Sequence, residues 1–303
     1  ANCPAPRLHS DLPKLGALAV DDASAPKFRT PSLIRLARPR QWIKNAFVAA
    51  PLFFTPEAAT IANLALVALA VVVFCLLSSA AYVLNDYCDR EADRAHPLKR
   101  HRPIAAGEIR PGAALALASA LALLAAVLAI AVLAPDFWLF AAAYAGLNLL
   151  YSFGLKRVSI LDVFLIAIGF VLRVHAGAAA IEVYPTVWIT VCTGLLALFL
   201  ALAKRRDDLV RALPESHRAS LGGYNLRFID ASLAMVLGAL IVSYILYTVD
   251  PAVTLRMGTE QLYLTAPFVI AGVLRYLQIT LVEERSGAPT ELALSGRGRA
   301  VLD

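Results

Sequence analysis

The 303-residue sequence is poor in charged residues, cysteine and histidine. Only 17% of its residues are charged and 59% are hydrophobic, whereas soluble proteins average about 25% charged residues. Its mean hydropathy of +0.68 indicates an integral membrane protein and argues against a soluble domain. The 4 cysteines contain no CxxC pair, which indicates neither a disulfide framework nor a zinc site.

Two further patterns are missing. Residues 1–30 are polar and contain no long apolar core, so no cleavable signal peptide is visible and a flexible N-terminal tail is expected. The net charge of +6 is not arranged on a basic face interleaved with aromatic residues, which argues against nucleic acid as a partner. We expect a transmembrane catalytic domain over 31–282 and a polar C-terminal tail over 283–303.

Long apolar runs fill most of the remaining sequence. They are rich in Ala, Leu and Val and lack period-2 alternation, which predicts an all-α membrane bundle rather than a β-barrel. At about 20 apolar residues per crossing, we expect about eight transmembrane helices. These lie near 42–55, 62–84, 112–133, 136–154, 160–181, 185–203, 228–249 and 261–282.

The basic residues gather in the loops on one side of these expected crossings. Those loops carry clusters at 35–44, 90–110, 156–157 and 204–227. The opposite loops at 56–61, 134–135 and 182–184 contain no Lys or Arg, and 250–260 contains only Arg256. Because cytoplasmic loops are enriched in Lys and Arg, we expect a multi-pass protein of the plasma (inner) membrane whose polar cleft and active site face the cytoplasm.

The most informative stretch is NDYCDREADRAHPLKRHRPIAAG at 85–107, which follows the second expected crossing. Asp86, Asp89 and Asp93 are spaced i, i+3, i+7, so on a helix they project within roughly 60° of one another. Aligned carboxylates at a membrane boundary repel one another unless a cation lies between them. Oxygen ligands with open coordination positions suit Mg²⁺, whose shell is usually completed by water and phosphate oxygens.

We therefore expect Asp86, Asp89 and Asp93 to be the catalytic metal ligands, with Mg²⁺ as the cofactor. Two nearby cations, Lys99 and Arg102, are suited to the phosphates of a substrate. Asn85 would orient a hydroxyl or phosphate oxygen.

A second polar cluster, KRRDDL at 204–209, ends the sixth expected crossing. Lys204 and Asp208 are i, i+4 neighbours on a helix, so they would present a cation and a carboxylate to the same diphosphate. A positive-inside anchor followed by a solvated acidic turn explains this cluster equally well.

Several isolated polar residues are further candidates. Tyr151 and Lys156 in YSFGLKR would hydrogen-bond phosphate, although an interfacial aromatic followed by basic residues is also common. Asp162 and Arg173 lie inside the fifth expected crossing, where an ionisable side chain is a candidate site residue by default. Arg173 would hold a phosphate, and Asp162 would serve the metal, a sugar hydroxyl or Lys156. Lys44 is either a headgroup anchor or a phosphate ligand.

These motifs resemble the UbiA superfamily of intramembrane prenyltransferases. The superfamily is defined by NDxxDxxxD, here from Asn85. RPRQWIKN at 38–45, YSFGLKR at 151–157 and KRRDDL at 204–209 are similar to its decaprenyl-phosphate phosphoribosyltransferase branch. The resemblance implies a UbiA-like bundle, Mg²⁺ dependence and phosphoribosyl pyrophosphate as donor. Such proteins usually continue into a ninth helix, which we expect to be absent or truncated in a chain that stops at Asp303.

The reaction implied by the resemblance transfers 5-phosphoribose to a polyprenyl (decaprenyl) phosphate in the lipid bilayer. It releases pyrophosphate and supplies precursors of cell-envelope arabinan. A UbiA-type prenyltransferase acting on an aromatic acceptor would use the same aspartates and is the nearest alternative. A cation-coupled transporter is less well supported, because its charges would lie at mid-bilayer rather than at one face. The sequence leaves open whether the chain forms a homo-oligomer.

Overall fold

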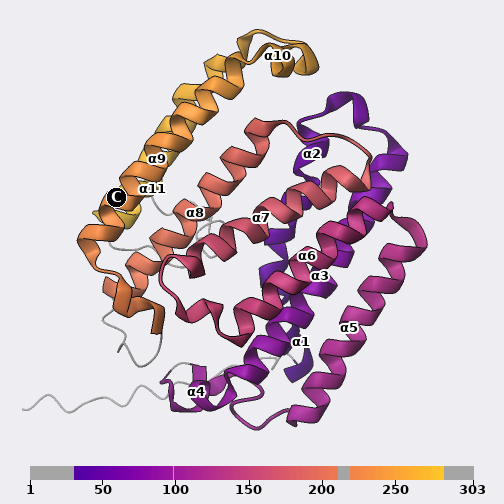
Figure 1. The fold of residues 1–303 in the computed structure, drawn as a ribbon, viewed down its shortest axis with the longest axis vertical. Helices are drawn as coiled ribbons and strands as arrows, with labels where there is room; N and C mark the ends of the chain where they lie inside the picture. The colour runs from indigo at the N-terminus through magenta and orange to yellow at the C-terminus, as the bar shows by residue number, and fades with distance from the viewer. Residues whose placement is uncertain (1–30, 98, 211–218, 283–303) are drawn as a thin grey trace, which may run out of the picture. The chain divides into compact units, whose positions relative to one another are not determined.

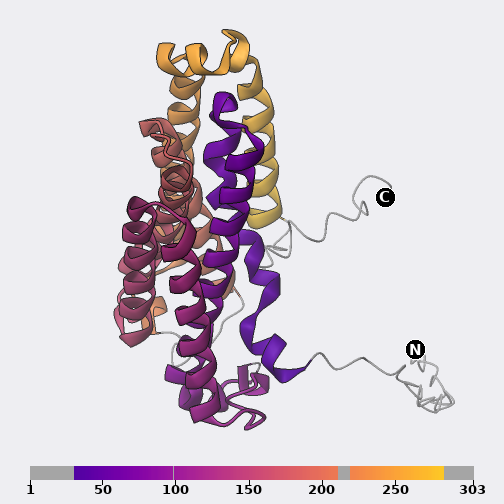
Figure 2. The same ribbon diagram turned by 90° about the vertical axis from the view of Figure 1, so that its right-hand side faces the viewer.

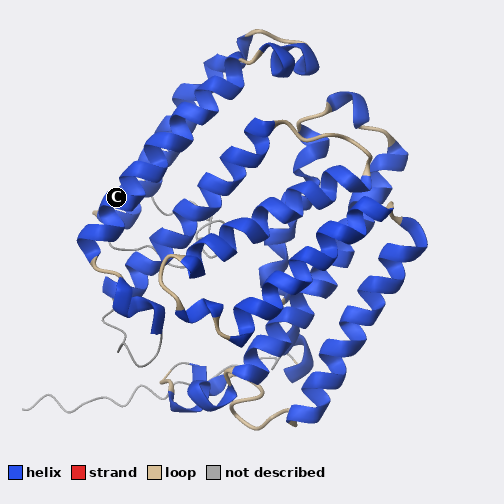
Figure 3. Cartoon of the chain, in the orientation of Figure 1, coloured by secondary structure: helices blue, strands red, loops and turns tan. Residues whose placement is uncertain are grey.

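The structure is a computed structural model that describes residues 31–97, 99–210 and 219–282. The tails expected at 1–30 and 283–303 lie outside these residues. The α-helices are α1 Ser32–Ala37, α2 Ala50–Phe53, α3 Ile61–Cys88, α4 Arg90–Ala95, α5 Pro111–Val132, α6 Pro135–Phe153, α7 Leu161–Ala180, α8 Val187–Val210, α9 Leu226–Val249, α10 Pro251–Met257 and α11 Ala266–Leu281. Short 3-10 helices are η1 Pro39–Ala49, η2 Pro56–Ala58, η3 Lys99–His101, η4 Leu155–Arg157, η6 Ala219–Gly223 and η7 Gln261–Thr265. Within the described ranges there is no β-strand (Figure 3).

The all-α architecture predicted from the apolar runs is confirmed, whereas the expected count of about eight crossings is not confirmed. Six described helices are long and apolar enough to cross a membrane: α3, α5, α7, α8, α9 and the segment Gln261–Leu281. The run at 136–154 forms α6, a helix of 19 residues. The run at 42–55 forms no single helix, because η1 and the 4-residue α2 share it. Pro39 and Pro51 each remove a backbone donor, which limits how far a regular helix can extend here.

The long helices form a bundle in which neighbours in sequence are neighbours in space. α3 packs against α5, α6 against α7, α7 against α8 and α8 against α9 (Figure 1). In the perpendicular view these helices run alongside one another (Figure 2). Two of these helices begin at residues whose side chains cap the first turn. At α3 the Thr60 hydroxyl accepts a hydrogen bond from the amide of Asn63, and at α9 the Asn225 side chain accepts one from the amide of Phe228.

The apolar core has two main parts. One joins α3, α5, α6 and α7 around Phe74 and Phe137, both fully buried. The other joins α7, α8 and α9 around Phe199 and Ile229. α7 contributes to both parts, and it also packs against η1. It is therefore the central helix, and the polar residues on it lie between the two halves of the core.

The approach of α7 to η1 depends on a glycine. A Cβ atom on Gly177 would lie 1.8 Å from the carbonyl oxygen of Val48, a backbone atom that cannot rotate away. Real Cβ atoms do not come so close, so only glycine allows α7 to contact η1 at this point.

Gly177→Ala is expected to destabilise the bundle by about 1–3 kcal/mol, because the added methyl forces α7 away from η1. The matched control is Gly238→Ala on α9, where a Cβ meets no atom within 4 Å and helix propensity favours alanine. Thermal unfolding of both variants in detergent tests this. Equal melting temperatures for the two variants would show that the close contact does not constrain the fold.

Candidate functional site

The three predicted aspartates lie where α3 ends and α4 begins. Asp86 is on the last turn of α3, Asp89 is the N-cap of α4, and Asp93 is inside α4. Asp86 and Asp93 are only 2% and 3% exposed. Leu36 and Ile104 belong to a small apolar cluster beside this helix end. The three aspartates thus lie at the junction of α3 and α4, called the acidic site below, and their shared role as metal ligands stays a prediction.

Two arginines neutralise the buried aspartates. Arg38 Nη2 donates to both carboxylate oxygens of Asp86, at 2.6 and 2.8 Å. Arg102 Nη1 lies between two carboxylates, 2.9 Å from Asp86 Oδ1 and 2.7 Å from Asp93 Oδ2. A single cationic atom therefore bridges Asp86 and Asp93. Charge-assisted hydrogen bonds of this length are the strong kind, so the side chains are well fixed.

The third aspartate is paired with a different segment. Lys156 Nζ, from η4, lies 2.5 Å from Asp89 Oδ1 and 2.9 Å from Asn85 Oδ1. Asn85 Nδ2 also donates to Asp89 Oδ2 at 3.1 Å. Asn85, Asp89 and Lys156 thus form one hydrogen-bonded group, which brings together residues that are 67 to 71 positions apart in the sequence.

The carboxylate oxygens of these aspartates are ligands that suit a divalent cation. Among the residues that the structure describes, no three His, Cys, Asp or Glu side chains are gathered closely enough to enclose a metal ion. Mg²⁺ does not need such a cage, because it is usually held by one or two carboxylates together with water and substrate phosphates. Asp86 and Asp93 already converge on a cationic nitrogen of Arg102. Burial raises the pKa of Asp93, which Arg102 opposes, and a metal ion would act in the same direction as that arginine.

Arg38 is a site residue that the sequence did not single out. It had been grouped with the basic lead-in at 35–44, although it pairs with Asp86 and lies 5.2 Å from the ring centre of Tyr82. Its backbone is left-handed, with φ 52°, which is uncommon for a residue with a side chain. Arg38 immediately precedes Pro39, and the residue before a proline is disfavoured in the right-handed α region, but no pattern in the sequence indicated its pairing with Asp86.

Arg173 is buried inside the bundle with uncharged partners. Its guanidinium donates to Asn45 Oδ1 at 2.9 Å, to the Gly169 carbonyl at 2.9 Å and to the Tyr144 hydroxyl at 2.7 Å. Within the described residues no carboxylate forms an ion pair with it. Both Arg173 and Arg38 act electrostatically on the ammonium group of Lys44. Lys44, Arg38 and Arg173 therefore form a region of excess positive charge beside the acidic site.

Asp162 lies in a separate buried network at the start of α7. It is 0% exposed, and Arg205 Nε donates to its Oδ2 at 2.7 Å. Ser220 Oγ and Tyr224 OH donate to the same carboxylate at 3.0 and 2.7 Å. Burial and the bond to Asp162 raise the pKa of Tyr224 to about 12, so its hydroxyl remains protonated. Asp162 does not pair with Lys156, and Arg205 is its counter-ion.

The remaining candidates are placed as follows. Asp208 lies 3.4 Å from Arg205 Nη1, and Lys204 is exposed on the same helix. Lys99 lies in η3, and Tyr151 is partly buried in α6. The two arginines of KRRDDL are structural: Arg205 binds Asp162, and Arg206 binds Asp230 and the carbonyl of Thr280.

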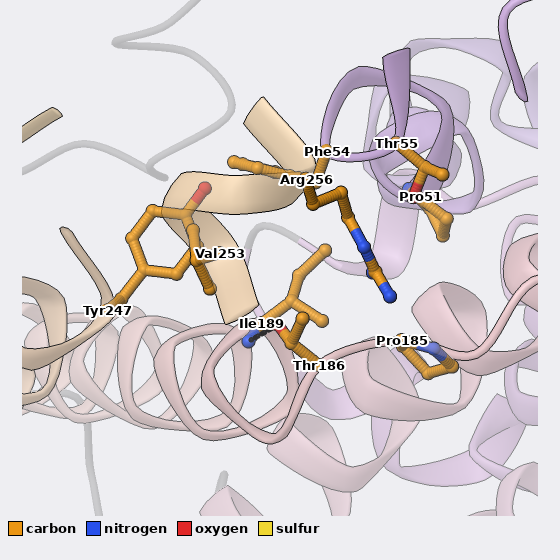
Figure 4. A pocket seen from close by; sticks show the side chains of 9 residues that line it. All are labelled: Pro51, Phe54, Thr55, Pro185, Thr186, Ile189, Tyr247, Val253 and Arg256. Atoms are coloured by element: carbon orange, nitrogen blue, oxygen red, sulfur yellow. Dashed lines mark hydrogen bonds between the residues drawn. The ribbon is translucent and has the colours of Figure 1, made fainter. Parts of the chain in front are cut away.

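A small hollow lies at the opposite ends of α8 and α9 from these networks. Its lining includes Ile189, Tyr247 and Arg256 (Figure 4). The free volume is about 10 Å³, roughly enough for one water molecule. Arg256 Nη1 donates to the carbonyl of Tyr184 at 3.3 Å. This hollow is too small for a diphosphate, and it contains no carboxylate.

The fold is shared with a protein of known structure. A UbiA homologue from Archaeoglobus fulgidus, solved bound to DMAPP and Mg²⁺, superposes with a TM-score of 0.70 over 87% of this chain and 93% of that one, at 19% identity. Identity at that level shows the likeness of the folds alone. The apolar helices and the shared fold define a multi-pass helical membrane protein of this architecture.

The family follows from the sequence comparison. The UbiA prenyltransferase family matches residues 45–295, and the chain belongs to this family. It is 35% identical to a decaprenyl-phosphate phosphoribosyltransferase of Mycolicibacterium smegmatis, over 96% of this chain and 95% of that protein. It is 36% identical to the protein of the same name from Corynebacterium glutamicum, over 91% of this chain and 85% of that one.

Asp162→Asn is expected to destabilise the protein strongly, because it leaves the fully buried Arg205 with only the longer 3.4 Å contact to Asp208 as an ion pair. Breaking a buried pair costs about 3–5 kcal/mol, whereas a partly exposed pair is worth about 0–1 kcal/mol. Asp230→Asn is the matched control, since Asp230 pairs with the adjacent Arg206 and is 41% exposed. Thermal unfolding should show the larger loss for Asp162→Asn. The reverse order would mean that the buried pair is not a main support of α7 and α8.

Proposed function

We propose that this protein transfers 5-phosphoribose from phosphoribosyl pyrophosphate to a polyprenyl phosphate, with Mg²⁺ as cofactor, and releases pyrophosphate. The acceptor would be decaprenyl phosphate or a similar lipid, and the product a precursor of cell-envelope arabinan. The site would open toward the cytoplasm from the inner membrane, since the acidic site and the basic loops lie at one end of the helices and cytoplasmic loops are enriched in Lys and Arg.

One observation carries the proposal. Aspartates on α3 and α4 meet cations from three other segments, namely Arg38, Arg102 and Lys156, at one end of the bundle. A diphosphate bound through a divalent ion needs both kinds of group, carboxylates for the metal and cations for its own oxygens. The near full-length likeness to two phosphoribosyltransferases supports phosphoribose as the transferred group.

The donor would bind at the acidic site. Asp86, Asp89 and Asp93 would hold Mg²⁺, which supplies a Lewis acid for the pyrophosphate oxygens. Lys156 and Arg102 would then bind the phosphate oxygens instead of the carboxylates and stabilise the negative charge that develops on the leaving group. Lys99, Lys204 and Asp208 would contact the rest of the donor, with Asn85 orienting a hydroxyl or phosphate oxygen.

The acceptor would bind at the region of excess positive charge. Arg173 supports this assignment, because its hydrogen-bond partners are all uncharged and a buried cation without a counter-ion attracts an anion. Lys44 and Arg38 would add to that attraction, and Tyr151 would donate a hydrogen bond. The phosphate oxygen of the acceptor is already an anion, so it attacks the oxocarbenium-like donor carbon without a strong general base.

The second candidate is transfer of a prenyl group from a prenyl diphosphate to an aromatic acceptor. The family membership favours this candidate, and the acidic site would serve it equally well. The sequence KRRDDL at the end of α8 argues against this second candidate. It departs from the second aspartate-rich motif usual in aromatic prenyltransferases, and its two arginines form structural pairs with Asp162 and Asp230.

The direct test supplies detergent-purified protein with phosphoribosyl pyrophosphate, Mg²⁺ and polyprenyl phosphate. We expect pyrophosphate and a lipid-linked phosphoribose in equal amounts, detected by mass spectrometry. Chelating the divalent ion should abolish both products. Turnover of a prenyl diphosphate with an aromatic acid, and none with the phosphoribosyl donor, would establish the second candidate instead.

Asp89→Asn is expected to reduce turnover at least about 100-fold, because it removes a metal ligand and the partner of Lys156. Glu91→Gln is the matched control, since Glu91 is a nearby acidic residue of α4 that pairs only with exposed or half-buried arginines. Both variants should keep the melting temperature of the wild type within a few degrees. An active Asp89→Asn enzyme would remove Asp89 from the metal site.

A further inference from the structure

The turn between α6 and α7 has a strained backbone. It covers residues 154–160 and contains η4, which carries Lys156. Ile160 has φ 71°, and a β-branched residue at positive φ is a genuine outlier. Such strain persists only where the surroundings hold it, and it is common at functional sites. Something must therefore hold this turn in place.

The turn is held by the segment that precedes α9. The hydroxyl of Tyr224 accepts a hydrogen bond from the strained amide of Ile160 at 2.5 Å and donates one to Asp162 at 2.7 Å. Ser159 Oγ donates to the carbonyl of Ser220 at 2.7 Å. Two consecutive residues of the turn are thus bound by the segment 220–224.

A glycine allows this contact. A Cβ atom on Gly223 would lie 2.1 Å from Ser159 Oγ and 2.6 Å from Ser159 Cβ. The neighbouring Gly222 has no atom within 4 Å of such a Cβ. The two segments therefore approach each other closely at Gly223 and not at Gly222.

The other part of the same turn reaches the acidic site. Lys156 is four residues before Ile160, and its ammonium contacts Asp89 and Asn85. Tyr224 is 7% exposed and packs in the apolar core of α7, α8 and α9, while its hydroxyl bonds Ile160 and Asp162. The turn at Ile160 therefore connects the Tyr224 hydroxyl directly to the segment that carries Lys156.

We propose that Tyr224 is a positioning residue, whose hydroxyl holds the turn at Ile160 and thereby places Lys156 in the diphosphate site. This role rests on one part of the proposed function, the binding of a diphosphate by Lys156. Both phosphoribosyl and prenyl donors contain that group. The raised pKa of Tyr224, about 12, keeps the hydroxyl protonated, so its bond to Asp162 persists at neutral pH.

The first test compares Tyr224→Phe with Tyr244→Phe. The control removes a hydroxyl that bonds Thr265, away from the turn. Hydrogen exchange of peptides covering 154–160 is measured in the full-length protein without ligand, and the affinity for inorganic pyrophosphate with Mg²⁺ by calorimetry. We expect Tyr224→Phe to speed exchange in these peptides and to weaken pyrophosphate binding about tenfold, the loss of one hydrogen bond. Tyr244→Phe should change neither quantity.

A double mutant separates positioning from general destabilisation. If Tyr224 acts through Lys156, adding Tyr224→Phe to Lys156→Met should weaken pyrophosphate binding no further, because coupled residues are not additive. Gly223→Ala gives a second route with the hydroxyl intact: it should weaken binding about tenfold by displacing Ser159, while Gly222→Ala should not. This pair keeps the proposal testable even where Tyr224→Phe fails to fold.

Three results would overturn the proposal: unchanged exchange in Tyr224→Phe, faster exchange with unchanged pyrophosphate affinity, or fully additive losses in the double mutant. A wild type that does not bind pyrophosphate would also overturn it. By contrast, a wild type that binds pyrophosphate but transfers no phosphoribose would contradict the proposed function and leave the positioning role of Tyr224 supported by the binding data.

Discussion

The structure depends on how carboxylates are neutralised at the boundary of an apolar bundle. Asp86 and Asp93 are almost fully buried, and a buried charge without a partner costs several kcal/mol. Arg38 and Arg102 meet that requirement within the chain, and Arg102 bridges both carboxylates through one nitrogen atom. The same requirement explains why a divalent cation and a diphosphate suit this site, since they would replace the internal partners without leaving charges unpaired.

A second buried network links the site to the rest of the bundle. Asp162 and Arg205 are both 0% exposed, and they join the start of α7 to the end of α8. Tyr224 extends this network to the turn that carries Lys156. Because α7 also contributes to both parts of the apolar core, the acidic site is connected to the packing of the helices through this network.

Most of the fold was predictable from the apolar runs. The spacing of three aspartates predicted acidic side chains on one face at the end of α3, and their role as metal ligands stays a prediction. The run at 42–55 was the exception, because prolines and the polar residues Lys44 and Asn45 favour η1 over a crossing helix. The sequence did not reveal which cation meets which carboxylate. Arg205 is 43 positions from its partner Asp162. Basic residues beside a membrane helix are also explained by the positive-inside rule alone. Their specific partners are therefore visible only in the three-dimensional structure.

The central claim is that the aspartates exchange their internal cations for a divalent ion carrying a diphosphate. Titration of the detergent-purified protein with Mn²⁺, followed by electron paramagnetic resonance, tests this directly with and without inorganic pyrophosphate. The account predicts weak Mn²⁺ binding alone, because Arg38 and Arg102 compete for the carboxylates, and much tighter binding once pyrophosphate is present. Mn²⁺ that, at every pyrophosphate concentration, gives only the spectrum of its protein-free pyrophosphate complex would contradict it.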